Sequence, residues 1–88
     1  MTEIEIQTIA LKKGKPDRRK FKCIANDLGD YRTYFLPEET NRTLMRKRFA
    51  LERGCKIYDG DNILRVEWVK FTTPRPMIPI ILAVPLPP

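Results

Sequence analysis

The chain has 88 residues, 42% of them hydrophobic and 32% charged, and its 17 lysines and arginines against 11 acids give a formal net charge of +6. This length permits one domain with a modest core, since folding buries only roughly 60–65% of the surface of so short a chain, and a deep catalytic cleft is hard to build in it. The chain has no histidine, and its two cysteines alone do not make a zinc site, so we expect no metal and no cofactor. No apolar run reaches the roughly 20 residues that cross a bilayer, so we expect no membrane-spanning segment.

The first part of the chain predicts three strands. Residues 3–11 alternate polar and apolar side chains, with a change of parity midway that indicates a bulge or a bend. Residues 12–19 contain glycine, proline and many charges, which favours a turn, and residues 20–25 alternate again. After a second turn at residues 26–30, the aromatic and β-branched residues 31–36 predict a third strand.

The middle of the chain predicts one helix followed by a hairpin. Residues 37–41 contain the proline and the early acids typical of a helix start, and Gly54 stands where a C-terminal cap belongs. Two strands, residues 55–58 and 63–71, then flank a turn at residues 59–62. The apolar stripe of the helix consists of Leu44, Met45, Phe49 and Leu51. The side chains that share one face of the last strand are Leu64, Val66 and Trp68.

The chain changes character after residue 73. Residues 74–88 hold six of the eight prolines and are otherwise mostly apolar. Such a segment is not expected to form a central strand or a regular helix, and it is too apolar for a solvated linker. We therefore divide the chain into a folded domain, residues 1–73, and an extended proline-rich arm, residues 74–88, which packs on its own domain or on another subunit. The residues expected to bind a partner are Met77, Ile78, Ile80, Ile81, Leu82 and Val84.

The two cysteines, Cys23 and Cys55, each fall in a predicted strand. Because the N-terminus carries no signal peptide, we expect a reducing, cytoplasmic environment in which both thiols are buried as small apolar groups. A disulfide between them is the alternative.

The predicted order of strand, strand, strand, helix, strand, strand resembles that of OB-fold single-strand-binding domains. The segments that carry the resemblance are Ile9-Ala10-Leu11-Lys12-Lys13-Gly14-Lys15, Phe21-Lys22-Cys23-Ile24-Ala25-Asn26-Asp27-Leu28-Gly29 and Gly54-Cys55-Lys56-Ile57-Tyr58. The resemblance covers residues 4–72 and implies a mainly β fold, a small five-stranded barrel with one helix, in which the loop between the first two strands borders the ligand groove. The proline-rich arm has no counterpart in that family, and the acidic C-terminal tip of the bacterial single-strand-binding proteins is missing.

The basic residues concentrate in one hairpin. Between residues 12 and 22 there are seven cations and one acid, a sum of +6 that equals the net charge of the whole chain. Seven like charges within eleven residues repel one another, and phosphates lying between them relieve that repulsion. A solubilising hairpin tip is the alternative interpretation. The cations are Lys12, Lys13, Lys15, Arg18, Arg19, Lys20 and Lys22.

Aromatic residues are interleaved with cations in the second and third predicted strands. We expect Arg32 and Tyr34 to share an exposed face with Lys20 and Lys22, with Tyr31 and Phe35 on the opposite parity. Base stacking over a charged groove requires such a combination of aromatic and basic side chains. Tyr34 is the stacking candidate, followed by Tyr31 and Tyr58. The aromatic residues expected in the core are Phe21, Phe35 and Trp68.

The predicted helix carries a second basic cluster. Its cations are Arg42, Arg46, Lys47, Arg48 and Arg53. Such a run most often forms a solvated helix face that pairs with acids, as Glu38 could with Arg42. As nucleic-acid contacts we take Arg42 and Arg46.

No catalytic motif accompanies these features. The acids fall in a helix start and in turns, and no phosphate-binding glycine loop or nucleophile elbow occurs. We therefore expect a sequence-tolerant binder of DNA or RNA, with single strands favoured, and not an enzyme. The alternative is a structural or adaptor subunit of a larger assembly, a virion or a nucleoprotein complex, that docks or forms a homo-oligomer through the proline-rich arm.

Overall fold

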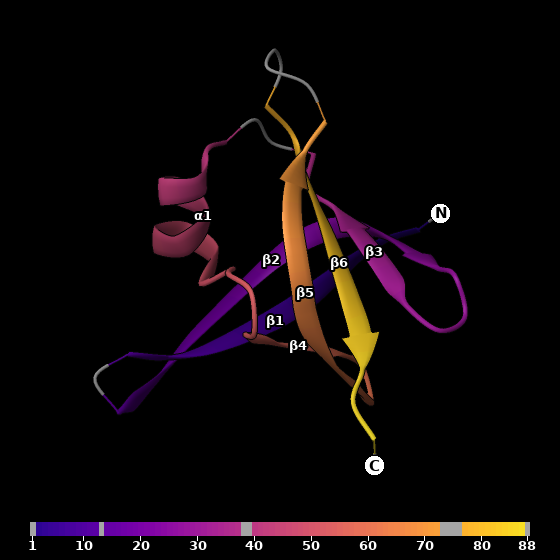
Figure 1. The fold of residues 1–88 in the computed structure, drawn as a ribbon, viewed down its shortest axis with the longest axis horizontal. Coiled ribbons are helices and arrows are strands. Elements are labelled where there is room, and N and C mark those ends of the chain that lie inside the picture. Colours follow the sequence, from indigo (N-terminus) through magenta and orange to yellow (C-terminus); the bar gives the residue numbers. More distant parts are fainter. Residues whose placement is uncertain (1, 13, 38–39, 73–76, 88) are drawn as a thin grey trace.

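The computed structural model describes residues 2–12, 14–37, 40–72 and 77–87. Over these residues the chain forms six strands and one helix (Figure 1). In chain order they are β1 (Thr2–Lys12), β2 (Lys15–Asp27), β3 (Arg32–Phe35), α1 (Arg42–Phe49), β4 (Lys56–Asp59), β5 (Asn62–Phe71) and β6 (Pro79–Pro85). The prediction of a mainly β domain with one helix is confirmed.

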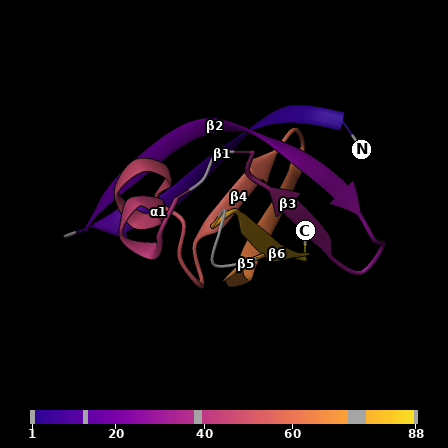
Figure 2. The same cartoon turned by 90° about the horizontal axis from the view of Figure 1, so that it is seen from above.

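The strands close into a ring in the order β1-β2-β3-β6-β5-β4, with β4 paired back to β1 and all neighbours antiparallel. β1 and β2 form a long hairpin in which Thr2 lies opposite Ala25 and Lys12 opposite Lys15. Residues 15–19 are therefore strand and not the predicted charged turn, because pairing with β1 continues to the end of the hairpin. Seen from above, α1 lies beside this hairpin (Figure 2).

Alternate residues of the strands fill the ring. Ile6 and Phe21 are cross-strand partners and both are buried. The Phe21 ring meets the ring of Phe49 from α1, with centroids 4.8 Å apart, and the buried hydroxyl of Thr8 donates to the Phe49 carbonyl. An apolar and a polar contact thus both attach α1 to the β1–β2 hairpin.

The helix α1 is shorter than the predicted one. The Asn41 side chain accepts a hydrogen bond from the Leu44 backbone N–H at 2.9 Å, so the helix begins after Asn41. It ends at Ala50, which takes left-handed backbone angles (φ 52°), and Gly54 is not its cap. Of the predicted stripe, Leu44 is exposed, and the buried members are Met45, Phe49 and Leu51.

The C-terminal residues provide the largest correction. β6 lies between β3 and β5 and pairs with both, so the prediction that prolines keep this segment out of the sheet is wrong. The reason is positional: Pro79 and Pro85 stand at the two ends of β6, and the residues between them keep their N–H donors. Residues 74–76 and 88 of the predicted arm lie outside the described residues.

The side chains of β6 alternate between the core and the outside. Ile81 is fully buried, so it is not available to a partner as the sequence suggested. The other predicted partner contacts are half-buried, and those that belong to β6 have the outward parity. They are Met77, Ile78, Ile80, Leu82 and Val84.

A register shift in β5, between Val66 and Trp68, reverses which residues point inward. Before it, Leu64 and Val66 are buried; beyond it, Trp68 lies opposite Leu82 and is half-buried, while Val69 packs against the core. A bulge adds one residue to one strand, so alternation resumes with the opposite parity. The prediction that Trp68 belongs to the core with Leu64 and Val66 is therefore wrong.

Cys23 and Cys55 are buried free thiols, so the predicted burial is confirmed and no disulfide joins them. Burial raises the pKa of Cys23 to about 12 and also raises the pKa of Cys55, because a thiolate loses its hydration inside the ring. Both side chains act as small apolar groups of the core.

Replacement of Ile81 by alanine tests the position of β6. The Ile81 side chain is buried and its backbone pairs with Tyr34 and Val69, so the variant leaves a cavity. We expect the free energy of unfolding to fall by about 2–4 kcal/mol. Leu82→Ala, on the outward face of the same strand, is the matched control and should cost about 1 kcal/mol or less. Urea unfolding followed by circular dichroism measures both, and equal losses would contradict this placement of β6.

Candidate functional site

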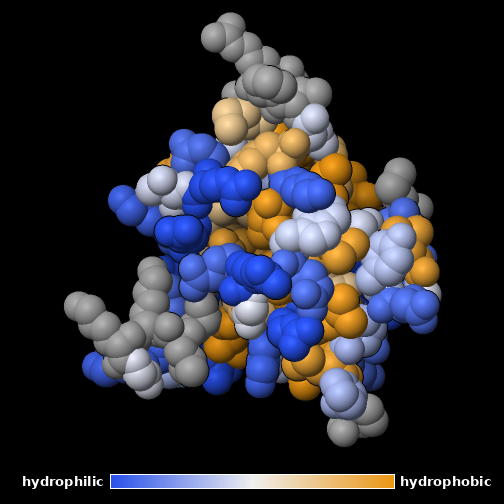
Figure 3. Space-filling model, viewed as in Figure 1, coloured by the Kyte–Doolittle hydropathy of each residue, from blue (hydrophilic) through white to orange (hydrophobic). Residues whose placement is uncertain are grey.

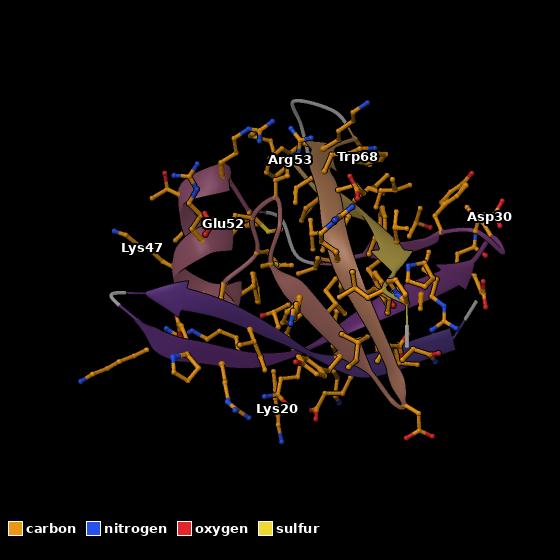
Figure 4. All side chains as sticks on the ribbon, turned by 60° about the horizontal axis from the view of Figure 1, so that its bottom comes forward. Lys20, Asp30, Lys47, Glu52, Arg53 and Trp68 are labelled. Carbon is orange, nitrogen blue, oxygen red and sulfur yellow. The ribbon has the colours of Figure 1, made fainter. Side chains whose placement is uncertain are left out.

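The cations of β2 point outward because its alternate residues fill the core. Phe21 and Cys23 are buried, so the neighbouring Arg18, Lys20 and Lys22 have the outward parity, and all three are exposed. Figure 4 shows Lys20 pointing away from the ring. This outward row of β2 is the first part of the candidate site.

The pairing of β1 with both β2 and β4 extends that row across the sheet. Arg18 lies opposite Ile9, which lies opposite Lys56, which in turn lies opposite Arg65. Neighbouring strands are about 4.8 Å apart, so these side chains stand side by side on the outer surface. A second row runs in parallel through Lys20, Gln7, Tyr58 and Ile63.

Two of the outward cations have acidic neighbours. Lys22 lies opposite Glu5 in the β1–β2 pair, and Arg65 donates to the Glu67 carboxylate through Nε at 3.1 Å. These acids offset the charges of Lys22 and Arg65. The positive charge of this surface therefore comes chiefly from Arg18, Lys20 and Lys56.

Two hollows continue the surface from β4 toward α1. The first measures about 420 Å³, and its lining includes Ile9, Glu52, Arg53, Lys56 and Tyr58. The second measures about 390 Å³ and also contains Glu52 and Arg53. The charged and aromatic residues that it adds are Arg42, Arg46, Glu67, Trp68 and Lys70. Because the hollows share two residues, the surface is continuous from β2 to α1.

We call this continuous surface the basic track. Its cations are Arg18, Lys20, Lys56, Arg53, Arg46, Arg42 and Lys70. In Figure 3 a hydrophilic surface covers α1 and reaches β5, and hydrophobic residues lie beside it along β6. Lys47 lies on the other side of α1 from Arg53 and Trp68 (Figure 4), so it stands outside the track.

Acids neutralise only part of the charge of the track. Arg46 Nε lies 3.8 Å from Glu52 Oε2, with the two side chains 68% and 54% exposed. An exposed pair at this distance contributes little and is easily replaced by another anion. Over the described residues, seven cations of the track face two acids in its hollows, so a polyanion finds a net positive surface.

Tyr34 does not belong to the site, contrary to the prediction. Its ring is fully buried, and its hydroxyl donates to Asp59 Oδ2 at 2.8 Å. Burial and the hydrogen bond to this carboxylate raise the pKa of Tyr34 above its usual value. Phe35, expected in the core, is half-buried and takes the opposite parity. The assignment of faces in β3 was thus one residue out of phase.

Arg32, which was also predicted to bind nucleic acid, lies outside the basic track. Its guanidinium lies 2.9 Å from Asp59 and 3.3 Å from Asp27, and its side chain is 21% exposed. Two carboxylates neutralise its charge, and together with Tyr34 they connect β3 to the end of β4. Arg32 is therefore a structural residue.

The structure brings together only part of the predicted hairpin cluster. Arg19 shares the parity of the core residues and pairs with Asp17 at 2.8 Å, whereas Lys15 is exposed near the end of the hairpin. Lys13 and the side chain of Lys12 lie outside the described part of the chain. Arg42 and Arg46, predicted as a separate cluster, join the hairpin cations through the two hollows.

Sequence reasoning missed Lys56, Lys70 and Trp68. The alternation of Lys56, Ile57 and Tyr58 contains a usable signal, because a buried isoleucine between two polar residues places both on the outside. Trp68 has no such signal, since its exposure depends on the β5 bulge. Lys70 lies two residues beyond Trp68 in β5 and therefore shares its face, and its ammonium lies 4.7 Å from the centre of the Trp68 ring.

No protein-family model, curated protein or solved structure matches this chain. Within the described ranges, no three histidine, cysteine, aspartate or glutamate side chains gather closely enough to hold a metal ion. The part of the chain that the structure describes also has no helix with the length and apolar character required to cross a membrane. The case for a function rests on the geometry of the basic track.

Tyr34→Phe tests whether this residue is structural. The variant removes the hydroxyl that donates to Asp59 but keeps the buried ring. We expect the free energy of unfolding to fall by about 1.5–3 kcal/mol, the range for a hydrogen bond to a charged group. Binding of an oligonucleotide to the folded variant should stay unchanged. Urea unfolding measures the free energy of unfolding, and fluorescence anisotropy with a labelled oligonucleotide measures the affinity. Weaker binding by the folded variant would show that Tyr34 contributes to the site.

Proposed function

We propose that this protein binds single-stranded DNA or RNA along the basic track, with little dependence on sequence. The observation that carries the proposal is the continuity of the track: cross-strand pairing joins Arg18 to Lys56, and a shared hollow joins Lys56 to Arg53. Cations that follow one another along a surface can each contact a phosphate, and binding releases the counterions that surround the nucleic acid.

A single strand fits the track better than a duplex. Tyr58 and Trp68 are half-buried and line the two hollows, so each ring offers a surface to a base. Stacking on an aromatic side chain requires an unpaired base and tolerates every base type, at about 1–3 kcal/mol per base. A duplex, whose bases are paired, would contact the cations alone.

We further propose that the ring is OB-like, extended by one strand. The support is the order of its first five strands, with a helix between β3 and β4 and with β1 paired to both β2 and β4. β6 departs from the five-stranded pattern. The proposed role is binding and not catalysis, and the two free thiols fit the reducing environment of the cytoplasm.

Charge reversal at Lys20 or Lys56 tests the proposed track. Both lysines are exposed and lie on neighbouring rows of the outer surface. We expect either Lys→Glu variant to weaken binding about fivefold or more, to a similar extent for different sequences, and to lower the slope of log affinity against log salt by about 1. Fluorescence anisotropy over a salt series, with single- and double-stranded DNA and RNA of matched length, measures these effects.

Lys47→Glu is the matched control. It changes the net charge by the same amount on an exposed residue of α1, outside the track. We expect less than about a twofold loss, since only long-range attraction is reduced. Equal losses from Lys47→Glu and Lys56→Glu would show that the total charge and not the track governs binding. Absence of binding by the wild type at low salt would refute the proposal.

A second candidate function, association through an apolar face, is favoured by the outer side of β3 and β6. Ile24, Phe35 and Ile80 lie in one row across β2, β3 and β6, and all are half-buried. In the next row Leu82 lies between Thr33 and Trp68. A contiguous apolar patch of this kind is typical of a contact between subunits.

Sedimentation velocity of the wild type and Leu82→Lys tests this second function. We expect the wild type to form a homo-oligomer at micromolar concentrations, and Leu82→Lys to be monomeric and folded, because the charge falls on the outward face. Lys47→Glu serves as a surface control that should not alter the mass. A monomeric wild type would remove the support for self-association.

A further inference from the structure

The second hollow, beside Trp68, differs in character from the rest of the basic track. It measures about 390 Å³, which falls within the range of small-molecule sites. Met45 and Leu51 lie beneath it and are almost fully buried, so the half-buried Val69 and Trp68 supply its accessible apolar surface. Cations from α1, from the following loop and from β5 surround this apolar floor. Glu52 and Glu67 also line the hollow, so its four cations and two acids leave a net positive rim around the apolar surface.

The indole of Trp68 forms one side of the hollow and is only half-buried. The Lys70 ammonium lies over this ring, 4.7 Å from its centre, so a ligand reaches that face of the ring by displacing Lys70. Lys70 is exposed and its side chain is flexible, so it moves aside at small cost. A flat aromatic ligand can then stack on the indole with the ammonium nearby.

Arg46 and Arg53 supply positive charge to the same hollow. The contact of Arg46 with Glu52 is long, at 3.8 Å, and exposed to solvent. Arg53 is exposed, and the described residues include no carboxylate that pairs with it. Guanidinium groups bind phosphate oxygens through two parallel N–H donors, so these arginines suit a phosphate group.

We propose that this hollow binds one nucleotide, with the base stacked on Trp68 and the phosphate at Arg46 and Arg53. The inference takes the class of ligand, nucleic acid, from the proposed function and rests on it in that respect. It adds that one nucleotide of the strand binds differently from the others. That nucleotide is held by its base as well as by its phosphate. The remainder of the strand follows Lys56, Lys20 and Arg18 through phosphate contacts.

The chain contains a single tryptophan, so intrinsic tryptophan fluorescence reports on the surroundings of Trp68, which lines this hollow. The experiment titrates the full chain with adenosine monophosphate and follows the tryptophan emission. We expect saturable quenching with a dissociation constant between about 10 μM and 1 mM. Inorganic phosphate and ribose 5-phosphate should not quench, and adenosine should bind about tenfold more weakly than the monophosphate, since it lacks the phosphate.

Two variants, Arg46→Gln and Trp68→Leu, separate the contributions of the cations and of the ring, and Lys47→Gln is their control. Arg46→Gln should weaken the binding of adenosine monophosphate about fivefold or more. The variant keeps Trp68, so the tryptophan emission still reports on binding. Lys47→Gln, the adjacent lysine outside the hollow, should leave the affinity within about twofold. Trp68→Leu, followed by equilibrium dialysis with labelled adenosine monophosphate, should abolish mononucleotide binding. Circular dichroism should show all three variants folded, because all three positions lie outside the core.

The outcomes distinguish this inference from the proposed function. No quenching up to about 10 mM adenosine monophosphate, with oligonucleotide binding intact and dependent on Lys56, overturns the nucleotide site and leaves the track in place. Equal quenching by inorganic phosphate also overturns it, since the hollow is then an anion site without base stacking. Saturable quenching by the monophosphate with no oligonucleotide binding supports the hollow and refutes the track.

Discussion

The pairing of β1 with both β2 and β4 is the constraint on which the rest of the structure depends. It closes the ring, and closure requires every strand to place one face inward. With Phe21 and Ile57 directed into the core, the neighbouring lysines on β2 and β4 have no position except the outer surface. The same pairing places those two strands on either side of β1. The basic track is thus a consequence of how the core is filled.

The ring also explains why some polar residues serve structure alone. β3 has only four residues, and Tyr34 and Arg32 have the parity that faces inward. A buried hydroxyl and a partly buried guanidinium require acceptors, and Asp59 at the end of β4 accepts from both, at 2.8 and 2.9 Å. Removing one partner leaves the others unsatisfied, which costs more than the hydrogen bond itself contributes. This network attaches β4 to β3 without a direct strand pairing between them.

The presence of the strands up to β5 was predictable because side-chain alternation and turn residues are local signals. Two details were wrong: residues 15–19 belong to β2, and β1 keeps one register with β2, with Ile6 and Thr8 both buried, so the predicted change of parity is absent. The alternation of Phe21 and Cys23 with lysines gave the correct face of β2. β6 was not predictable from local signals, because prolines disfavour a central strand. They are tolerated here because Pro79 and Pro85 occupy the two ends of β6, and where those ends fall depends on the pairing with β3 and β5. Trp68 was assigned to the wrong face, since the β5 bulge is a property of the pairing with β6. For the candidate site, the charges of the hairpin and of the helix could be read from the sequence. The hollows that join them depend on tertiary contacts and could not.

Trp68 lies where the two outer surfaces of the ring meet. On one side it stands opposite Leu82 in the apolar face of β6, and on the other it lines the hollow that contains Arg46 and Arg53. A subunit seated on the apolar face would therefore contact the residue that we propose stacks a base. Binding a nucleotide and associating through β6 then act on the same side chain, and each changes the free energy of the other. The bulge that moves Trp68 out of the core thus connects the proposed stacking surface to the apolar face that we propose for association.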